Sequence, residues 1–215
     1  MLRSVMAWIA EHAQTLERAA DQHLALSLTG LAAAIALALP LALSLTRWTG
    51  AANAAIAAVN VLRTIPSLAL LVIMLPFLGT GFLPSAVALT LYGLPAILIN
   101  AYTGLREVDP DIVEAARGQG MTEGQILRRI AIPLAPPVIF AGIRTAAVQI
   151  VSAATLAAFI GGGGLGEMIT AGMNTLDIAQ LLVGGLTVAL FAVATELTFG
   201  LVEWGTRRLI AAPAA

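Results

Sequence analysis

The residues that could support chemistry are few, and their types exclude most kinds of catalysis. The chain has no cysteine, and its two histidines, His12 and His23, lie eleven residues apart near the N-terminus. Without thiolates, that spacing is weak support for a metal site. All eleven basic residues are arginine, so the lysine of a GxxxxGK[ST] phosphate loop is missing. We therefore expect no catalytic residue, no bound metal, no cofactor and no ATP hydrolysis by that mechanism.

A glycine run at residues 161–166, GGGGLG, formally satisfies the GxGxxG pattern of dinucleotide-binding proteins. That pattern needs a strand before the glycines and a helix after them. Here the preceding segment is apolar and long enough to cross a membrane, so we reject the dinucleotide interpretation. We predict a flexible outer loop instead, which serves as a hinge or a docking surface.

The segment 109–133 is charged, and turns interrupt it. Asp109 can cap a helix that begins with Pro110, where a missing N–H costs nothing. Gly118 and Gly120 can adopt the left-handed backbone that ends a helix. The first half of this segment therefore predicts a short helix followed by a glycine turn.

A second helix is predicted directly after that turn. Thr122 and Gln125 have the spacing of a capping box. The apolar residues that follow share one face, and two arginines lie beside them: Ile126, Leu127, Ile130, Arg128 and Arg129. A compact helix–turn–helix between apolar spans suits docking into a groove on a soluble partner.

The composition is that of a membrane protein with several spans. Hydrophobic residues make up 59% of the chain and charged residues only 11%, and the net charge of −1 argues against nucleic acid as a partner. We predict an all-α fold with five transmembrane helices, each near or above the roughly 20 residues that cross a bilayer. They span residues 24–45, 52–78, 83–104, 134–160 and 179–204. Pro66 and Pro76 predict a kink or a break in the second span.

The positions of the arginines predict the orientation. Seven of them fall in segments on one side of the five spans, and the opposite loops, 79–82 and 161–178, contain none. By the positive-inside rule, the C-terminus is inside and the N-terminus outside. Residues 1–22 then form an external segment, either an interfacial helix or a flexible tail, and residues 206–215 a cytoplasmic tail. The seven inner arginines are Arg47, Arg106, Arg117, Arg128, Arg129, Arg207 and Arg208.

Polar residues inside the spans are candidates for a translocation path. Arg63 could lie at a helix break before Pro66, and Arg144 could extend toward the inner surface. Glu196 falls deep in the last span and needs a partner or a water-filled cavity. The uncharged candidates, for which helix–helix hydrogen bonding is the commoner use, are Asn60, Thr64, Ser67, Asn100, Gln149, Ser152 and Thr155.

The stretch EAARGQGMTEGQILRRIAIP resembles the EAA motif of binding-protein-dependent ABC importer permeases. Six residues fall on that pattern, and Ile132 replaces its usual leucine with little change of volume. The resemblance extends over residues 23–205 and implies the five-span, MetI-like fold of type I importers. The six matching residues, which would couple to the ATPase, are Glu114, Ala115, Ala116, Gly120, Ile130 and Pro133.

A finer resemblance points to the osmoprotectant group of these permeases. The stretches at residues 63–71, 100–121 and 142–151 look like permeases for glycine betaine, choline, carnitine or proline betaine. Permeases for methionine, and for alkanesulfonates or taurine, share the general motif but resemble these stretches less. A methionine permease is therefore the alternative within the family.

The resemblance also implies partners and a cellular location. Segment 109–133 would be a coupling helix seated in a cleft of a separate ATPase that binds ATP and magnesium. Glu114 would orient it through polar contacts, and Gly120 would form a turn where a side chain could clash. The family implies two copies of the ATPase, a second permease subunit (identical or related), an external binding protein, and a bacterial or archaeal plasma (inner) membrane.

Two hypotheses from other classes remain. A gradient-driven secondary transporter would use Arg144 and Glu196 as intramembrane charges, but it predicts inverted repeats or a charge relay, and neither is convincing in the sequence. A non-transporting scaffold would use segment 109–133 only to bind a partner. The gradient-driven transporter also leaves the docking-like segment unexplained.

Overall fold

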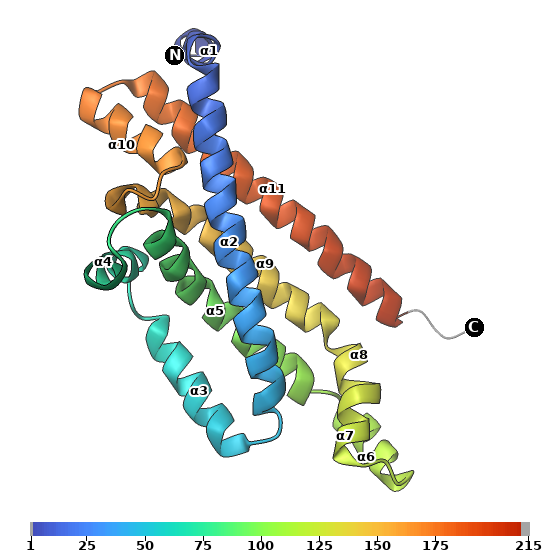
Figure 1. Ribbon diagram of the computed structural model, residues 1–215. Helices are drawn as coiled ribbons and strands as arrows, with labels where there is room; N and C mark the ends of the chain where they lie inside the picture. Colours follow the sequence, from blue (N-terminus) through green and yellow to red (C-terminus); the bar gives the residue numbers. More distant parts are fainter. Residues whose placement is uncertain (1, 212–215) are drawn as a thin grey trace.

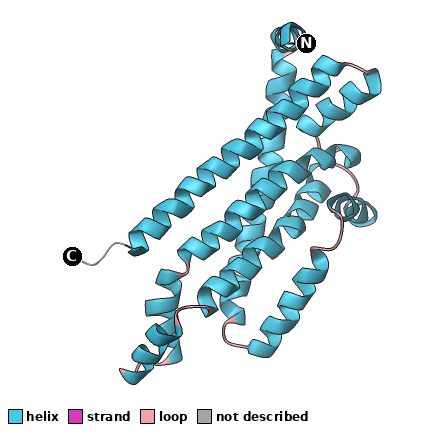
Figure 2. Ribbon diagram, turned by 180° about the vertical axis from the view of Figure 1, so that it is seen from behind, coloured by secondary structure: helices cyan, strands magenta, loops and turns pink. Residues whose placement is uncertain are grey.

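The computed structural model describes residues 2–211, which are helical almost throughout (Figures 1 and 2). Figure 2 shows no strand among these described residues. The longer elements are α1 (Leu2–Glu11), α2 (Ala13–Leu45), α3 (Thr49–Leu62), α4 (Ser67–Leu78), α5 (Phe82–Arg106), α9 (Pro136–Ala153), the 3-10 helix η2 (Ala154–Ile160), α10 (Leu165–Thr175) and α11 (Ile178–Ala211).

Between α5 and α9 the chain forms a smaller unit, which we call the polar hairpin (residues 109–134). It contains α6 (Pro110–Gly118), α7 (Glu123–Ile126), the π-helical turn η1 (Leu127–Ala131) and α8 (Ile132–Leu134). Figure 1 shows the polar hairpin at the opposite end of the bundle from α1 and α10. The turn between α2 and α3 lies toward the hairpin end as well.

Four helical segments of the described chain are long and apolar enough to cross a membrane: α2, α5, α9 with η2, and α11. If α3 and α4 count together as one further span, the described chain has five. The two helices meet at an angle of 99°. The bend falls at Pro66, which cannot donate a backbone hydrogen bond to continue α3. The predicted break is therefore confirmed at Pro66, whereas Pro76 lies inside α4 without ending it.

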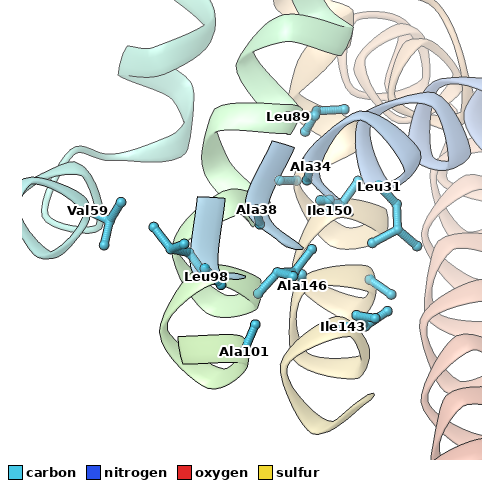
Figure 3. Close-up of a cluster of buried hydrophobic side chains, with 14 of the residues drawn as sticks. Leu31, Ala34, Ala38, Val59, Leu89, Leu98, Ala101, Ile143, Ala146 and Ile150 are labelled. Atoms are coloured by element: carbon cyan, nitrogen blue, oxygen red, sulfur yellow. The ribbon is translucent and has the colours of Figure 1, made fainter. Parts of the chain in front are cut away.

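The bundle core is built from small side chains on α2, α5 and α9. Ala34 and Ala38 of α2 belong to one buried cluster with Leu98 of α5 and Ala146 of α9 (Figure 3). Small residues allow helix backbones to approach closely, so that packing can hold helices together where hydrocarbon surrounds them. Alanine-rich faces on these three helices thus define which spans form the centre.

At the α1 end, the N-terminal residues are folded. Residues 2–11 form α1, and Trp8 is buried beside Leu165, Met168 and Val183. Helix α2 begins at Ala13, eleven residues before the predicted start of the first span. The alternative of a flexible tail is therefore wrong. The described part of this segment is helical, as the alternative of an interfacial helix predicted.

The glycine segment (residues 161–166) is packed rather than free, so the predicted flexible loop is wrong. The backbone N–H of Gly164 donates to Oε1 of Gln22 at 3.1 Å, and Gly164 itself is buried against His23 of α2. Because glycine has no Cβ, the chain can approach α2 closely there. The rest of the predicted outer loop is also ordered, since it contains α10.

The charged residues predicted inside the spans find partners across α9 and α11. The Arg144 guanidinium donates to Glu196 and, at 3.1 Å, to Glu203, which also pairs with Arg207 at 2.7 Å. The predicted need of Glu196 for a partner is confirmed. Arg144 forms its ion pairs with side chains of α11, whereas the sequence predicted that it extends alone toward the inner surface. Arg63 lies at the end of α3, directly before the break, as predicted.

Candidate functional site

The first limb of the polar hairpin begins and ends as its sequence predicts, with one exception. The Asp111 N–H donates to Oδ1 of Asp109 at 2.9 Å, and Pro110 is the first residue of α6. At the other end, Gly120 has φ +79°, and its N–H donates to the carbonyl of Arg117 at 2.9 Å. Gly118 remains helical, so only Gly120 adopts the predicted left-handed backbone.

The second limb starts with the predicted capping box. Thr122 Oγ1 accepts from the Gln125 N–H at 3.4 Å, and Gln125 Oε1 accepts from the Thr122 N–H at 2.8 Å. The helix then widens into a π-helical turn, in which the Ile132 N–H donates to the carbonyl of Leu127. Proline clashes with the carbonyl four residues before it in a regular α-helix. Widening the turn ahead of Pro133 lets the chain continue without breaking.

An ion pair joins the two limbs across the glycine turn. The Arg117 Nε donates to Glu123 Oε1 at 2.8 Å, and both side chains are largely exposed. The hydrogen bond from Arg117 lowers the pKa of Glu123, and the same bond raises the pKa of Arg117. Sequence reasoning missed this pair, although opposite charges on either side of a predicted turn were a usable signal.

One side of the polar hairpin is anchored and the other is exposed. Ala116, Ile126 and Ala131 are buried, at 5% exposure each, and the hairpin contacts α5 through η1 and α8. Glu114 and Ala115 are exposed on α6. The hairpin therefore presents a fixed, outward-facing surface that a partner can contact.

The structure brings the six residues of the EAA pattern into this one unit. Ile130 is half-buried in the π-helical turn, and Pro133 is exposed in α8, on the limb opposite Glu114. No atom lies within 4 Å of a Cβ built on Gly120. The predicted clash is therefore wrong within this chain, and the left-handed φ is what requires glycine at this position.

The seven uncharged candidates for a translocation path are spread over α3, the turn that follows it, α4, α5, α9 and η2. Asn60 and Thr64 are exposed near the end of α3, Ser67 begins α4, and Asn100 is half-buried on α5. Three of the seven donate to a backbone carbonyl three or four residues earlier: Thr64 Oγ1 and Thr155 Oγ1 at 2.7 Å, and Asn100 Nδ2 at 2.8 Å. The others, Gln149 and Ser152, lie on α9. Their role in a path remains a prediction.

Both histidines make contacts that sequence reasoning missed. His23 is fully buried, and its Nε2 donates to the carbonyl of Val151 on α9 at 3.0 Å. His12 stacks on Trp8, with ring centroids 4.6 Å apart. A histidine inside an apolar helix face was the signal for His23, because a buried ring nitrogen needs a partner.

These features define a class of protein, namely a multi-span helical membrane protein with a polar helical hairpin between two spans. The particular family follows from comparison. Residues 30–208 match the family described as "Binding-protein-dependent transport system inner membrane component", and the chain belongs to that family. The resemblance seen in the EAA stretch is confirmed.

Curated relatives give the subgroup that the chain most resembles. It is 40% identical, over 94% of its length and 92% of the relative, to the carnitine transport permease protein OpuCB of Listeria monocytogenes. It is also 40% identical to the choline transport system permease protein OpuBB of Bacillus subtilis, over 85% of this chain and 84% of that one. The chain is therefore similar to osmoprotectant permeases, as the finer resemblance predicted.

Solved structures give the fold. An inward-facing form of the MetNI methionine ABC transporter matches with a TM-score of 0.76, covering 89% of this chain and 95% of that one at 23% identity. A second crystal form of the same transporter gives a TM-score of 0.78 at 21% identity. The predicted MetI-like helical fold is confirmed, and at this identity the match concerns the fold alone.

Proposed function

We propose that this chain is the permease subunit of an ATP-driven importer for a compatible solute such as glycine betaine, carnitine or choline. The polar hairpin carries the proposal, since it brings the six EAA residues into one capped helical unit on which Glu114 and Ala115 are exposed. The names of the relatives, which transport carnitine, choline and glycine betaine, support the substrate class. The solute would be delivered by an external binding protein and would pass along the polar residues of α3, α4, α5, α9 and η2.

The proposed orientation has the N-terminus outside and the C-terminus in the cytoplasm of a bacterial or archaeal cell. Support comes from the arginines, seven of which follow spans toward the hairpin end, whereas Arg3 and Arg18 belong to the α1 end. The hairpin then faces the cytoplasm, where ATP is available. Two copies of a separate ATPase would bind ATP and magnesium, and a second permease subunit would complete the path. This chain would have no ATPase activity of its own.

The contacts suggest how movement of the hairpin would reach the spans. The hairpin continues through α8 directly into α9, because α8 ends at Leu134 and α9 begins at Pro136. Helix α9 packs against α5 and is joined to α11 by the Arg144 ion pairs. When two ATPases close on ATP, they would draw two hairpins together, and α9 would carry α5 and α11 with it as near-rigid bodies.

The alternatives predict different behaviour. A gradient-driven transporter needs charges that can change partner or protonation during transport. Arg144 and Glu196 are instead part of a closed set of ion pairs with Glu203 and Arg207, so this observation does not favour that hypothesis. Methionine remains the alternative substrate within the family, because methionine permeases share the general EAA motif that this chain carries.

Substrate-stimulated ATP hydrolysis in proteoliposomes tests the proposal. The reconstituted complex contains this chain with a partner ATPase and binding protein, and it receives glycine betaine, choline, carnitine, proline or methionine in turn. We expect a quaternary ammonium compound to stimulate ATP hydrolysis by the complex. This chain alone should hydrolyse no ATP. Stimulation by methionine only would overturn the substrate class. ATP hydrolysis or nucleotide binding by the isolated chain would overturn the assignment of ATP binding and hydrolysis to a separate subunit.

A further inference from the structure

A cavity of about 680 Å³ lies between the polar hairpin and the ends of α2 and α5. Three arginines line it, Arg47, Arg106 and Arg117, together with one acidic residue, Glu123. The rest of its wall is largely apolar and comes from both the spans and the hairpin: Leu105, Val108, Val113, Ile126, Leu127 and Ala131. The cavity is thus amphipathic, with an excess of positive charge.

Two of the three arginines have no carboxylate partner among the described residues. Glu123 pairs with Arg117 at 2.8 Å and neutralises it. Arg106 donates from Nη1 to the backbone carbonyl of Thr46 at 3.4 Å, which is a neutral acceptor. The nearby acids Glu107 and Asp109 line a different cavity, of about 260 Å³. Arg47 and Arg106 therefore leave this cavity about two charges positive.

The cavity lies where two spans end. Helix α2 ends at Leu45 and α5 ends at Arg106, after long apolar windows. Trp48, next to Arg47, is 73% exposed, and an exposed tryptophan beside arginine at the end of a span is typical of the membrane–water interface. Leu41 and Leu43 on the last turns of α2 are exposed as well. These side chains are what the end of a span at the hydrocarbon–headgroup boundary requires, and the cavity is lined by Thr46 and Arg47, directly after this end of α2.

We propose that this cavity binds the headgroup phosphate of an anionic phospholipid. Arg47 and Arg106 would donate to the phosphate oxygens, since guanidinium groups match phosphate geometry. The apolar wall would accommodate the glycerol and the first carbons of the acyl chains. Basic pockets between spans on the cytoplasmic side are suited to such headgroups. A lipid bound there would connect the end of α2 to the polar hairpin.

Quenching of Trp48 fluorescence by brominated lipids tests this proposal on the full chain. The variant with W8F and W204F leaves Trp48 as the only tryptophan, and it is placed in phosphatidylcholine vesicles containing brominated phosphatidylglycerol or brominated phosphatidylcholine. We expect a preference of several-fold for phosphatidylglycerol. R47Q or R106Q should each reduce that preference by about fivefold or remove it, because each arginine near a membrane surface contributes about that factor. Both side chains are exposed, but Arg106 donates a hydrogen bond to Thr46, so R47Q is the safer of the two for folding.

The matched control is R208Q, which removes the same charge from the end of α11, where Arg208 stacks on Trp204. It should keep the preference, and an equal loss in R208Q would overturn the cavity as the site. Native mass spectrometry of the unmodified chain, counting bound phosphatidylglycerol, gives a second readout that needs no tryptophan substitution. Competition by millimolar inorganic phosphate would indicate a soluble anion instead, and loss of the preference when the ATPase binds would indicate a protein occupant. Either result would overturn the proposal.

Discussion

The polar hairpin and the glycine segment both join helices through short stretches that contain glycine, but they need glycine for different reasons. In the hairpin, Gly120 has φ +79° and open space around the position of a Cβ. In the glycine segment, Gly166 has an ordinary φ, but a Cβ there would meet the backbone of Thr155, with its carbonyl carbon at 2.8 Å. Gly120 is needed for its backbone conformation, and Gly166 is needed for close packing.

That difference matches what each region has to do. Under the proposed function the hairpin contacts a partner and must keep its outer surface free. Its shape is fixed by caps, by the left-handed turn and by the Arg117–Glu123 pair. A connection at the opposite end must hold η2, α10 and α2 together, so its backbone is pressed into neighbouring helices. Substitutions in the two regions should therefore fail in different ways.

The largest effect is expected for Gly166→Ala. The added Cβ would lie inside contact distance of the Thr155 carbonyl group, and backbone cannot move aside as a flexible side chain can. We expect a loss of about 3 kcal/mol or more in the free energy of unfolding, seen as little monodisperse protein after detergent extraction. Gly185→Ala is the control, because nothing lies within 4 Å of its Cβ position. A normal yield and thermal transition for Gly166→Ala would contradict the packing role.

A smaller effect with a different signature is expected for Gly120→Val. A left-handed backbone costs an L-residue about 1–2 kcal/mol, and a β-branched residue tolerates it poorly. That cost corresponds to about a tenfold loss of the native hairpin conformation. We therefore expect about tenfold less substrate-stimulated ATP hydrolysis, with normal insertion and yield.

Gly118→Val is the matched control for Gly120→Val, because Gly118 is helical and has open space around it. It should keep most of the activity. Equal losses in both variants would mean that the surface of the hairpin, and not the backbone of its turn, is sensitive. A poor yield for Gly120→Val would remove the contrast with Gly166.

How well the sequence predicted these regions depended on how local the determining contacts are. The caps at Asp109 and Thr122 and the break at Pro66 were predicted correctly, because a few neighbouring residues decide them. The role of Gly118 was predicted wrongly, since either glycine of the pair could have ended the helix. The packing of Gly164 against His23 depends on residues 141 positions apart, which no local pattern shows.

The candidate site divides in the same way. Six EAA residues could be located from spacing alone, whereas the π-helical turn before Pro133 could not, because a proline permits a kink, a break or a widened turn. The Arg117–Glu123 pair depends on the direction in which the second limb leaves the turn. The translocation path is the least predictable part, since the hydroxyl groups of Thr64 and Thr155 can donate to backbone carbonyls three residues earlier in the chain.

A third prediction concerns the buried side chain next to the glycine segment, His23. Replacing His23 by Leu removes the donor to the Val151 carbonyl, and an unpaired buried carbonyl costs about 1–3 kcal/mol. The His23 Nδ1 has no partner among the described residues, so its removal offsets part of that cost. We expect a net destabilisation of about 1–2 kcal/mol, measured by thermal unfolding in detergent. His23→Gln, which keeps a donor, should be less destabilised, and equal losses would indicate that ring volume matters more than the hydrogen bond.

The smallest effect is expected at the exposed ion pair of the hairpin. Arg117 lowers the pKa of Glu123 below its ordinary value of 4.5, so the pair contributes stability above that pH and loses it as the pH falls through the lowered value. Arg117 stays charged throughout this range, because its pKa is raised. At neutral pH, Glu123→Gln should lower the melting temperature by about 1 °C or less, since exposed ion pairs contribute little.

The difference between wild type and Glu123→Gln should vanish in acid and in high salt, where exposed charges are screened. The destabilisation of the His23 variants should not depend on salt, because the hydrogen bond from His23 to Val151 is buried between α2 and α9. Thermal unfolding of both variant sets, at low and at high salt, makes this comparison in one experiment. A salt-insensitive Glu123→Gln effect would mean that the hairpin is held by buried contacts, as the glycine segment is, and that its two limbs do not depend on the ion pair.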